Sequence, residues 1–380
     1  MFKFLCIVCI LIAQDNFLSS DIEENLAKKI TRFQKNQRIA SISFSLYKGR
    51  TYRYDYATGY ADINKKIKAT PDHIYPLASI TKPLTASVLL DVLEEEHISL
   101  TDSVYTYVSD FPEDVTFNEL LTHTSGFFRN KAYDDFIKGS DFTDVSNYLP
   151  KRWKRNKKNR YRYTNINYSA AGAAIDSISG GTFEDQMKTM FEFKSHHEPL
   201  VFMNEDSLPE NIVKTYLQRY RRRYLHRPIK AGLWQPAALG ATTAKGYAEF
   251  MRNTLTKSFI KKIESHKILV KERSYGKNKI YQEYYGLGFR LGYINNELYY
   301  VFHNGFIYGA LTTFCYFPTH DIGYVALSNM SSYPRARYPF SRVIRKMVKN
   351  ALDLDYNAPI QSSLLTSIQK QLEIPTLFVN

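Results

Sequence analysis

The order of strand-like and helix-like segments is what most constrains the fold of this 380-residue chain. A helical segment near 23–34 precedes two β-rich segments, 42–47 and 52–60, which flank Lys48-Gly49-Arg50, a sequence typical of a hairpin turn. Helical periodicity then appears in successive segments near 84–95, 116–121, 166–178, 183–191 and 245–253. Strand-like segments return at 285–293, 298–303, 309–317 and 322–328, before a last helix near 340–352. We therefore predict an α+β fold in which both chain ends form one antiparallel sheet, flanked by helices and interrupted by a mainly helical subdomain.

Approximate boundaries follow from these patterns. The sheet subdomain would comprise residues 21–84 and 280–352, and the helical subdomain residues 85–279. The stretch 194–236 is polar, basic and without clear periodicity, so we predict an irregular insert there. Residues 355–380 show no pattern that assigns them. Hydrophobic residues make up 44% of the chain, which suffices for a full core and excludes a disordered chain.

The first twenty residues are typical of an export signal. Lys3 precedes the apolar run 4–13, which is shorter than the roughly 20 residues that a membrane span requires. We therefore predict a cleaved signal peptide in residues 1–20 and an exported protein, periplasmic or extracellular, with no stable membrane span after cleavage. Val8 is bulkier than the residue that usually precedes a lipid-modified cysteine, so we expect no lipid anchor at Cys9. For the apolar run 4–13, the alternative to a signal peptide is a buried strand of the mature fold.

The formal net charge of +14 is concentrated in two basic clusters, at 151–162 and 219–230. Such clusters favour anionic partners, and anionic cell-envelope material is the candidate that fits an exported protein. We expect the first cluster to attract an anionic substrate. No nucleic-acid-binding motif accompanies the charge, so a nucleic-acid partner is not predicted. Once a signal is removed, Cys315 is the remaining cysteine; we expect no disulfide and a buried thiol at Cys315.

Ser79 and Lys82 are the candidate nucleophile and base. A serine hydroxyl is a poor nucleophile until a base removes its proton. A lysine three residues later on a helix lies on the same face, and desolvation can make it a neutral base. The serine N–H at a helix N-terminus can also stabilise an oxyanion. Further Ser-x-x-Lys tetrads begin at Ser45, Ser258, Ser274 and Ser367. Ser79 differs from these because a strand-like segment there gives way to a strongly helical one.

The segment around Ser79 has a familiar sequence. Pro-Leu-Ala-Ser-Ile-Thr-Lys-Pro-Leu-Thr-Ala at 76–86 resembles the nucleophile segment of the serine β-lactamase and penicillin-binding protein superfamily, in the branch of class C β-lactamases, soluble DD-peptidases and related esterases. Leu-Leu-Thr-His-Thr-Ser-Gly at 120–126 resembles a second hallmark, which we expect to be structural; a separate pair of His123 and Ser125 is the alternative. The resemblance runs in order from Ile42 to about Asn329 and implies acyl-enzyme chemistry.

The resemblance also assigns a Tyr-x-Asn motif to Tyr163-Thr164-Asn165. It implies that Tyr163 exchanges protons with Lys82, as a base and later as an acid to the leaving group. Asn165 would hydrogen-bond both the substrate amide and Lys82. Residues two apart in an extended segment point the same way, which suits a shared site.

The third family motif, on an edge strand, matches His303-Asn304-Gly305. Gly305 would let the substrate backbone lie along the strand, and the resemblance places a second oxyanion-binding N–H on Phe306. Asn304 stands where the family usually has threonine or serine, which argues against recognition of penicillin-like carboxylates. His303 replaces the usual lysine and would be cationic only at lower pH.

Other chemistries lack their motifs. The chain has no Gly-x-Ser-x-Gly elbow, His196-His197-Glu198 lacks metal-ligand spacing, and Gly286-Leu287-Gly288 lacks a third glycine, so no metal or cofactor is predicted. We predict an exported serine hydrolase that forms an acyl-enzyme on Ser79 and hydrolyses an amide or ester of a small molecule or peptide, with a D-alanyl peptide or a β-lactam as candidates. A carboxylesterase of the same fold and a non-catalytic module that binds envelope polymers are the alternatives.

Overall fold

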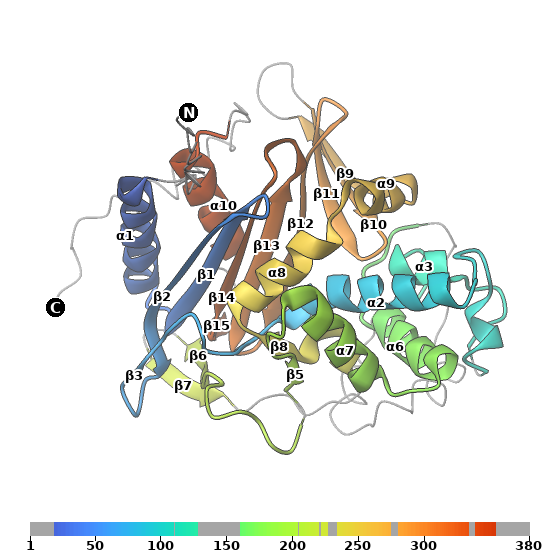
Figure 1. The fold of residues 1–380 in the computed structure, drawn as a ribbon, viewed down its shortest axis with the longest axis horizontal. Coiled ribbons are helices and arrows are strands. Elements are labelled where there is room, and N and C mark those ends of the chain that lie inside the picture. The colour runs from blue at the N-terminus through green and yellow to red at the C-terminus, as the bar shows by residue number, and fades with distance from the viewer. Residues whose placement is uncertain are drawn as a thin grey trace, which may run out of the picture.

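A large antiparallel sheet forms the centre of the computed structural model, which describes residues 19–109, 111–127, 160–203, 205–219, 222–226, 234–274, 280–333 and 339–354 (Figure 1). Its strands lie in the order β3-β2-β1-β14-β13-β12-β11-β10-β9. From the first part of the chain come β1 (Ser41–Lys48), β2 (Tyr52–Asp62) and β3 (Ile67–Lys68). From the last part come β9 (Ile268–Ser274), β10 (Ile280–Gly286), β11 (Phe289–Ile294), β12 (Glu297–Ile307), β13 (Ala310–Phe317) and β14 (Ile322–Ser328). The predicted α+β fold, with both chain ends in one sheet, is confirmed.

The two chain ends meet where β1 pairs with β14. The register runs from Ile42 opposite Ser328 to Lys48 opposite Ile322. Every residue of β1 except Lys48 is buried, because helices cover both faces of the sheet at this point. Helices α1 (Ser20–Asn36) and α10 (Phe340–Ala351) pack on one face, and α8 (Ala244–Thr254) packs on the other (Figure 1). The sheet therefore separates two hydrophobic cores, and the candidate site lies on the α8 side.

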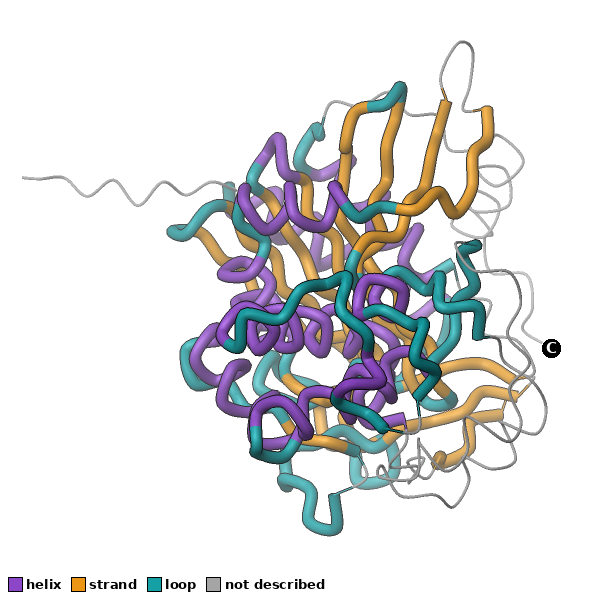
Figure 2. The backbone as a smooth tube through the Cα atoms, turned by 90° about the vertical axis from the view of Figure 1, so that its right-hand side faces the viewer, coloured by secondary structure: helices purple, strands orange, loops and turns teal. Residues whose placement is uncertain are grey.

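A helical layer completes the α8 side. It is built from α2 (Thr81–Glu95), α3 (Phe117–Leu121), α6 (Ile166–Ser179) and α7 (Phe183–Ser195), with α9 (Lys257–Ser265) beside β10. Helix α2 lies at the centre of this layer and is buried along nearly its whole length. Shorter turns are η1 (Ala78–Ile80), η2 (Val104–Thr106), η6 (Pro318–His320) and the π-helical η5 (Gln235–Leu239). Figure 2 shows the helices gathered against the sheet in a view turned by 90°.

Two sequence-based expectations are wrong. The stretch 194–236, expected to be irregular, contains β5 (Val201–Phe202), β6 (Thr215–Arg219) and β7 (Arg222–His226). Strand β5 joins β8 (Gly240–Thr242) and β4 (Tyr75–Pro76) in one small sheet, and β6 joins β7 and β15 (Met330–Tyr333) in another. The strand expected at 285–293 is instead the end of β10 and most of β11, because Leu287 and Gly288 have positive φ and turn the chain.

Several expectations concern residues outside those described, namely the signal peptide and the tail 355–380. Most of the first basic cluster also lies outside; Arg160 and Arg162 are described. Within the described ranges, no helix has the length and apolar character needed to cross a membrane. Cys315 is buried, as expected.

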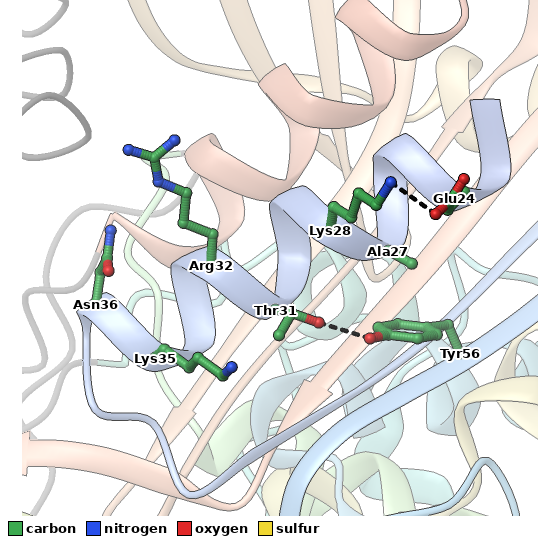
Figure 3. A pocket seen from close by; sticks show the side chains of 8 residues that line it. All are labelled: Glu24, Ala27, Lys28, Thr31, Arg32, Lys35, Asn36 and Tyr56. Atoms are coloured by element: carbon green, nitrogen blue, oxygen red, sulfur yellow. Dashed lines mark hydrogen bonds and ion pairs between the residues drawn. The ribbon is translucent and has the colours of Figure 1, made fainter. Parts of the chain in front are cut away.

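A surface pocket lies on the opposite side of the sheet from the candidate site, between α1 and β2 (Figure 3). Lys28 and Lys35 from α1 line it, and the Thr31 hydroxyl bonds the Tyr56 hydroxyl across it at 2.5 Å. Lys28 is paired with Glu24 one turn earlier on the helix. Because α1 packs into the other hydrophobic core, this pocket is separate from the chemistry described next.

Candidate active site

Ser79 occupies a tight turn between β4 and α2. The turn is the short helix η1, and its first residue, Ala78, has φ +52°, a conformation that residues with a Cβ rarely adopt. The residues flanking Ser79 are fully buried, whereas Ser79 itself is partly exposed. Hydrogen bonds from Leu77 N to Gly240 O (2.8 Å) and from Tyr247 Oη to Ile80 O (2.8 Å) fix the turn. The fold therefore presents one hydroxyl to solvent on a rigid support.

Lys82 lies one turn below the serine and is fully buried. Its Nζ is 3.4 Å from Ser79 Oγ, 2.7 Å from Asn165 Oδ1 and 2.9 Å from Ala237 O. Burial, helped by the positive charge of Arg290, holds the pKa of Lys82 well below its usual value. A neutral amine has two N–H groups and one lone pair. The two oxygens of Asn165 and Ala237 take the N–H groups, which leaves the lone pair for the Ser79 proton.

Tyr163 contacts the same hydroxyl through a hydrogen bond with Ser79. Lys82 Nζ is 4.9 Å from the centre of the Tyr163 ring. Burial raises the pKa of Tyr163, although a hydrogen bond with Ser79 opposes the shift. The phenol therefore keeps its proton at neutral pH and can donate it.

Residues 120–126 hold the Tyr163 segment in place through hydrogen bonds. Arg162 N donates to His123 O at 2.8 Å, and Thr164 N donates to His123 Nδ1 at 3.4 Å, so one residue holds both neighbours of Tyr163. Asn167 Nδ2 lies 3.2 Å from the same Nδ1. The Ser125 hydroxyl donates its proton to Asn167 Oδ1 at 2.8 Å, which favours a structural role for this stretch over a separate Ser–His pair.

Strand β12 brings the third motif beside the nucleophile. The sequence predicts an edge strand, but β12 lies between β13 and β11 in the sheet. Its end is nevertheless open on one side. Strand β11 pairs with β12 as far as Phe302, whereas β13 continues to pair through Ile307. The open stretch faces η1: a Cβ on Gly305 would stand 2.7 Å from Leu77 O and 3.0 Å from Ala78 Cβ. Glycine is therefore required there, and Phe306, 43% exposed, follows at the rim.

His303 and Asn304 have different surroundings. His303 is buried, with Nδ1 2.9 Å from Asn304 O and Nε2 3.4 Å from Tyr285 Oη. Burial and the positive charge of Arg290 lower the pKa of His303, so the imidazole is neutral. Asn304 is half-buried, and its Oδ1 accepts a hydrogen bond from Thr313 Oγ1 at 2.9 Å. That bond leaves the amide nitrogen of Asn304 as a donor.

Two groups near the site carry no local sequence signal. Arg290, on β11, bonds Glu283 and Tyr161, and its guanidinium lies 5.6 Å from the centre of the Tyr163 ring. The position of Arg290 beside Tyr163 depends on the turn at 287–288, a point where the sequence patterns predicted one continuous strand. The other group is the Ala237 carbonyl, which accepts a hydrogen bond from Lys82. Every residue has a backbone carbonyl, so residue type cannot indicate this role. The described residues contain no group of three or more His, Cys, Asp or Glu side chains suited to a metal ion.

The fold, the nucleophile turn and the buried lysine together define the class of serine β-lactamase and penicillin-binding protein folds. Within that class the chain belongs to the Beta-lactamase family, whose sequence profile matches residues 26–344.

Known proteins similar to this chain include two from Staphylococcus aureus. Protein flp of strain N315 is 22% identical over 327 residues, which cover 83% of this chain and 64% of that protein. The chain thus spans less than two thirds of the length of that relative. Teichoic acid D-alanine hydrolase of strain MRSA252 is 26% identical over 193 residues, 50% of this chain and 47% of that protein.

The solved structure of an octameric penicillin-binding protein homologue from Pyrococcus abyssi is similar throughout. It superposes with a TM-score of 0.73 at 23% identity, over 87% of this chain and 77% of that one. This similarity establishes the fold.

Proposed function

We propose that this chain is an exported serine hydrolase that cleaves an ester or amide through an acyl-enzyme on Ser79. The observation that carries the proposal is the environment of Lys82. It is buried, two oxygens bind its N–H groups, and its nitrogen lies 3.4 Å from Ser79 Oγ. A surface lysine in the same tetrad would stay protonated, whereas burial lowers the pKa of this one and favours the neutral form that a base requires.

The first half-reaction transfers the acyl group to the enzyme. Lys82 takes the Ser79 proton while Oγ attacks the substrate carbonyl, and the N–H groups of Ser79 and Phe306 bind the oxyanion. Tyr163 then donates its proton to the leaving oxygen or nitrogen as the carbonyl re-forms, and it recovers a proton from Lys82. Its raised pKa suits this acid role better than the base role that the family resemblance also allows.

The second half-reaction releases the product. A water molecule gives a proton to Lys82, attacks the acyl carbon, and expels Ser79 Oγ, which recovers a proton from Lys82. Asn165, whose Oδ1 is bound by Lys82, keeps its amide nitrogen available for the substrate.

The substrate we favour is a D-alanyl ester or amide attached to an envelope component. The relative named teichoic acid D-alanine hydrolase supports this choice, and so does the net charge of +14. Asn304 offers an amide donor in place of a hydroxyl, and we infer that penicillins are poor ligands. A small-molecule or peptide substrate fits this site, whereas no nucleic-acid-binding motif is present in the sequence.

The test is intact mass after incubation with a fluorophosphonate probe. We expect one adduct on the wild-type protein and none on Ser79→Ala. Folded protein without an adduct would contradict the proposal and favour a non-catalytic module that binds envelope polymers. A second incubation, with a penicillin, distinguishes the peptidase and β-lactamase branch from the esterase branch.

Arg290→Gln is expected to shift the acid limb of the kcat/KM profile to higher pH. Catalysis requires neutral Lys82, which is protonated below its pKa, and Arg290 helps to lower that pKa. Removing the guanidinium raises the pKa of Lys82, so a larger fraction is protonated and inactive at any given acidic pH. Glu283, which loses Arg290, keeps Lys271 as a partner at 2.6 Å.

Arg273→Gln is the control for Arg290→Gln. It removes an equal charge from the exposed strand β9, where Arg273 lies against the Tyr281 ring. Its pH profile should match that of the wild type. If the acid limb of Arg290→Gln were unchanged, the limb would not reflect the protonation of Lys82.

A further inference from the structure

A second surface leads away from the candidate site along the end of β12. Phe306 and Tyr308 are both exposed, at 43% and 39%, and their ring centres lie 5.7 Å apart. The Tyr308 ring in turn lies 6.2 Å from the ring of His226 on β7. A chain of contacts thus joins the residue after Gly305 to the small β6–β7 hairpin, which Figure 1 places at the lower end of the large sheet.

One face of the hairpin continues this path. Cross-strand partners are Thr215 with His226, Leu217 with Tyr224, and Arg219 with Arg222. Side chains alternate along a strand, so His226, Tyr224 and Arg222 share a face. A Cβ placed on Gly309, just after Tyr308, would stand 2.8 Å from Thr215 Cβ and 3.3 Å from His226 Nδ1. The turn after β12 is therefore packed against this face at its inner end.

The face becomes more exposed and more basic with distance from Ser79. Thr215 is 5% exposed, Tyr224 is 48% exposed, and Arg222 is exposed. Neither β6 nor β7 carries an acidic residue. His226 and Arg222 are four positions apart, or about 13 Å at roughly 3.3 Å per extended residue. A small ester at Ser79 cannot reach that far, whereas a polymer can.

From this arrangement we infer that Phe306, Tyr308, His226, Tyr224 and Arg222 form a binding strip for a linear phosphodiester polymer that carries the scissile acyl group. The inference rests on the proposed function and names its substrate class. Aromatic side chains supply stacking and apolar contact at low entropic cost, and the planar guanidinium of Arg222 matches two oxygens of one phosphate. The strip would hold the leaving-group side of the substrate, since Phe306 adjoins the oxyanion position.

The experiment compares two double variants on opposite faces of β7. Arg222→Ser with Tyr224→Ser removes the strip face, and Arg223→Ser with Leu225→Ser makes a similar loss of charge and exposed apolar surface on the other face. The substrates are the D-alanyl ester of poly(glycerol phosphate) and the methyl ester of N-acetyl-D-alanine. We expect the strip variant to lose about tenfold in kcat/KM on the polymer and to keep wild-type kcat/KM on the neutral ester. The opposite-face variant should resemble the wild type on both.

Equal losses in the two variants would overturn the inference, because a general charge effect would explain them; so would no loss in either. Binding separates this inference from the proposed function. In a Ser79→Ala background, linear polyphosphate should bind more weakly to the strip variant, whether or not the chain is an enzyme. Polyglutamate that binds as tightly as polyphosphate would overturn the assignment to phosphate. If the wild type hydrolysed neither ester while polyphosphate binding still depended on the strip, the proposed function alone would be contradicted.

Discussion

Ser79→Ala is expected to lower kcat on a D-alanyl ester by about four orders of magnitude, with the fold unchanged. The hydroxyl is the atom that forms the covalent bond, so its loss removes the acyl-enzyme route entirely. The fold should tolerate the change because Ser79 is partly exposed and the turn is held by its neighbours, through Leu77 N to Gly240 O and Tyr247 Oη to Ile80 O. Steady-state kinetics, with the thermal unfolding midpoint as a check on the fold, measures both expectations.

Ser258→Ala is the matched control. Ser258 begins another Ser-x-x-Lys tetrad, with Lys261, on the exposed first turn of α9. Its hydroxyl bonds Thr256 rather than a buried lysine. Activity should be unaffected by this change. If Ser79→Ala retained more than a small fraction of wild-type turnover on a verified, repurified sample, the nucleophile would have to be sought elsewhere.

Lys82→Arg is expected to lower kcat/KM by about three orders of magnitude while keeping the positive charge. Arginine cannot give up its proton in a protein, so it cannot act as a base. If Lys82 served only as a cation near the oxyanion, the arginine variant would retain much of the activity. The comparison therefore separates a proton acceptor from a fixed charge, which the loss of activity in an alanine variant would not do.

Burial makes a second variant necessary, because the longer arginine would crowd Asn165 Oδ1 and Ala237 O, which lie 2.7 Å and 2.9 Å from Lys82 Nζ. Lys82→Gln is smaller and can still donate to one of these oxygens. Loss of activity in both variants, with unfolding midpoints near that of the wild type, would support the base. Wild-type activity in Lys82→Gln would exclude Lys82 from proton transfer. Lys261→Arg, on exposed α9, should change nothing.

Local patterns predicted much of the fold. The hairpin of β1 and β2 formed where β-rich segments flank Lys48-Gly49-Arg50, and α2 formed where the apolar spacing is helical. The strand boundary at 287–288 was missed because an apolar run continues through it while the backbone turns at Leu287 and Gly288. Strands β6 and β7 were missed because their residues are largely polar and basic. Strand β6 pairs with β7 on one side and, on the other, with β15, more than a hundred positions later in the chain.

The candidate site, like the fold, was predicted from the sequence only in part. Ser79 with Lys82, and Tyr163 with Asn165, are short motifs whose members are two or three positions apart, and the family resemblance identified them as candidates. The structure adds that the two motifs meet, with Lys82 Nζ 2.7 Å from Asn165 Oδ1. Arg290 and the Ala237 carbonyl, which help to set the state of Lys82, could not be found from spacing.

By itself, the sequence determined the class of fold and predicted a candidate nucleophile segment with its chemistry, because residue type, periodicity and short spacing are local properties. Tertiary structure alone decided that Lys82 is buried with a lowered pKa, that β12 opens beside Ser79 after Phe302, and that Asn304 presents its amide nitrogen. These features depend on which distant segments exclude water from one another. Desolvation and cross-strand contacts arise between residues far apart in the chain, and no local pattern encodes them.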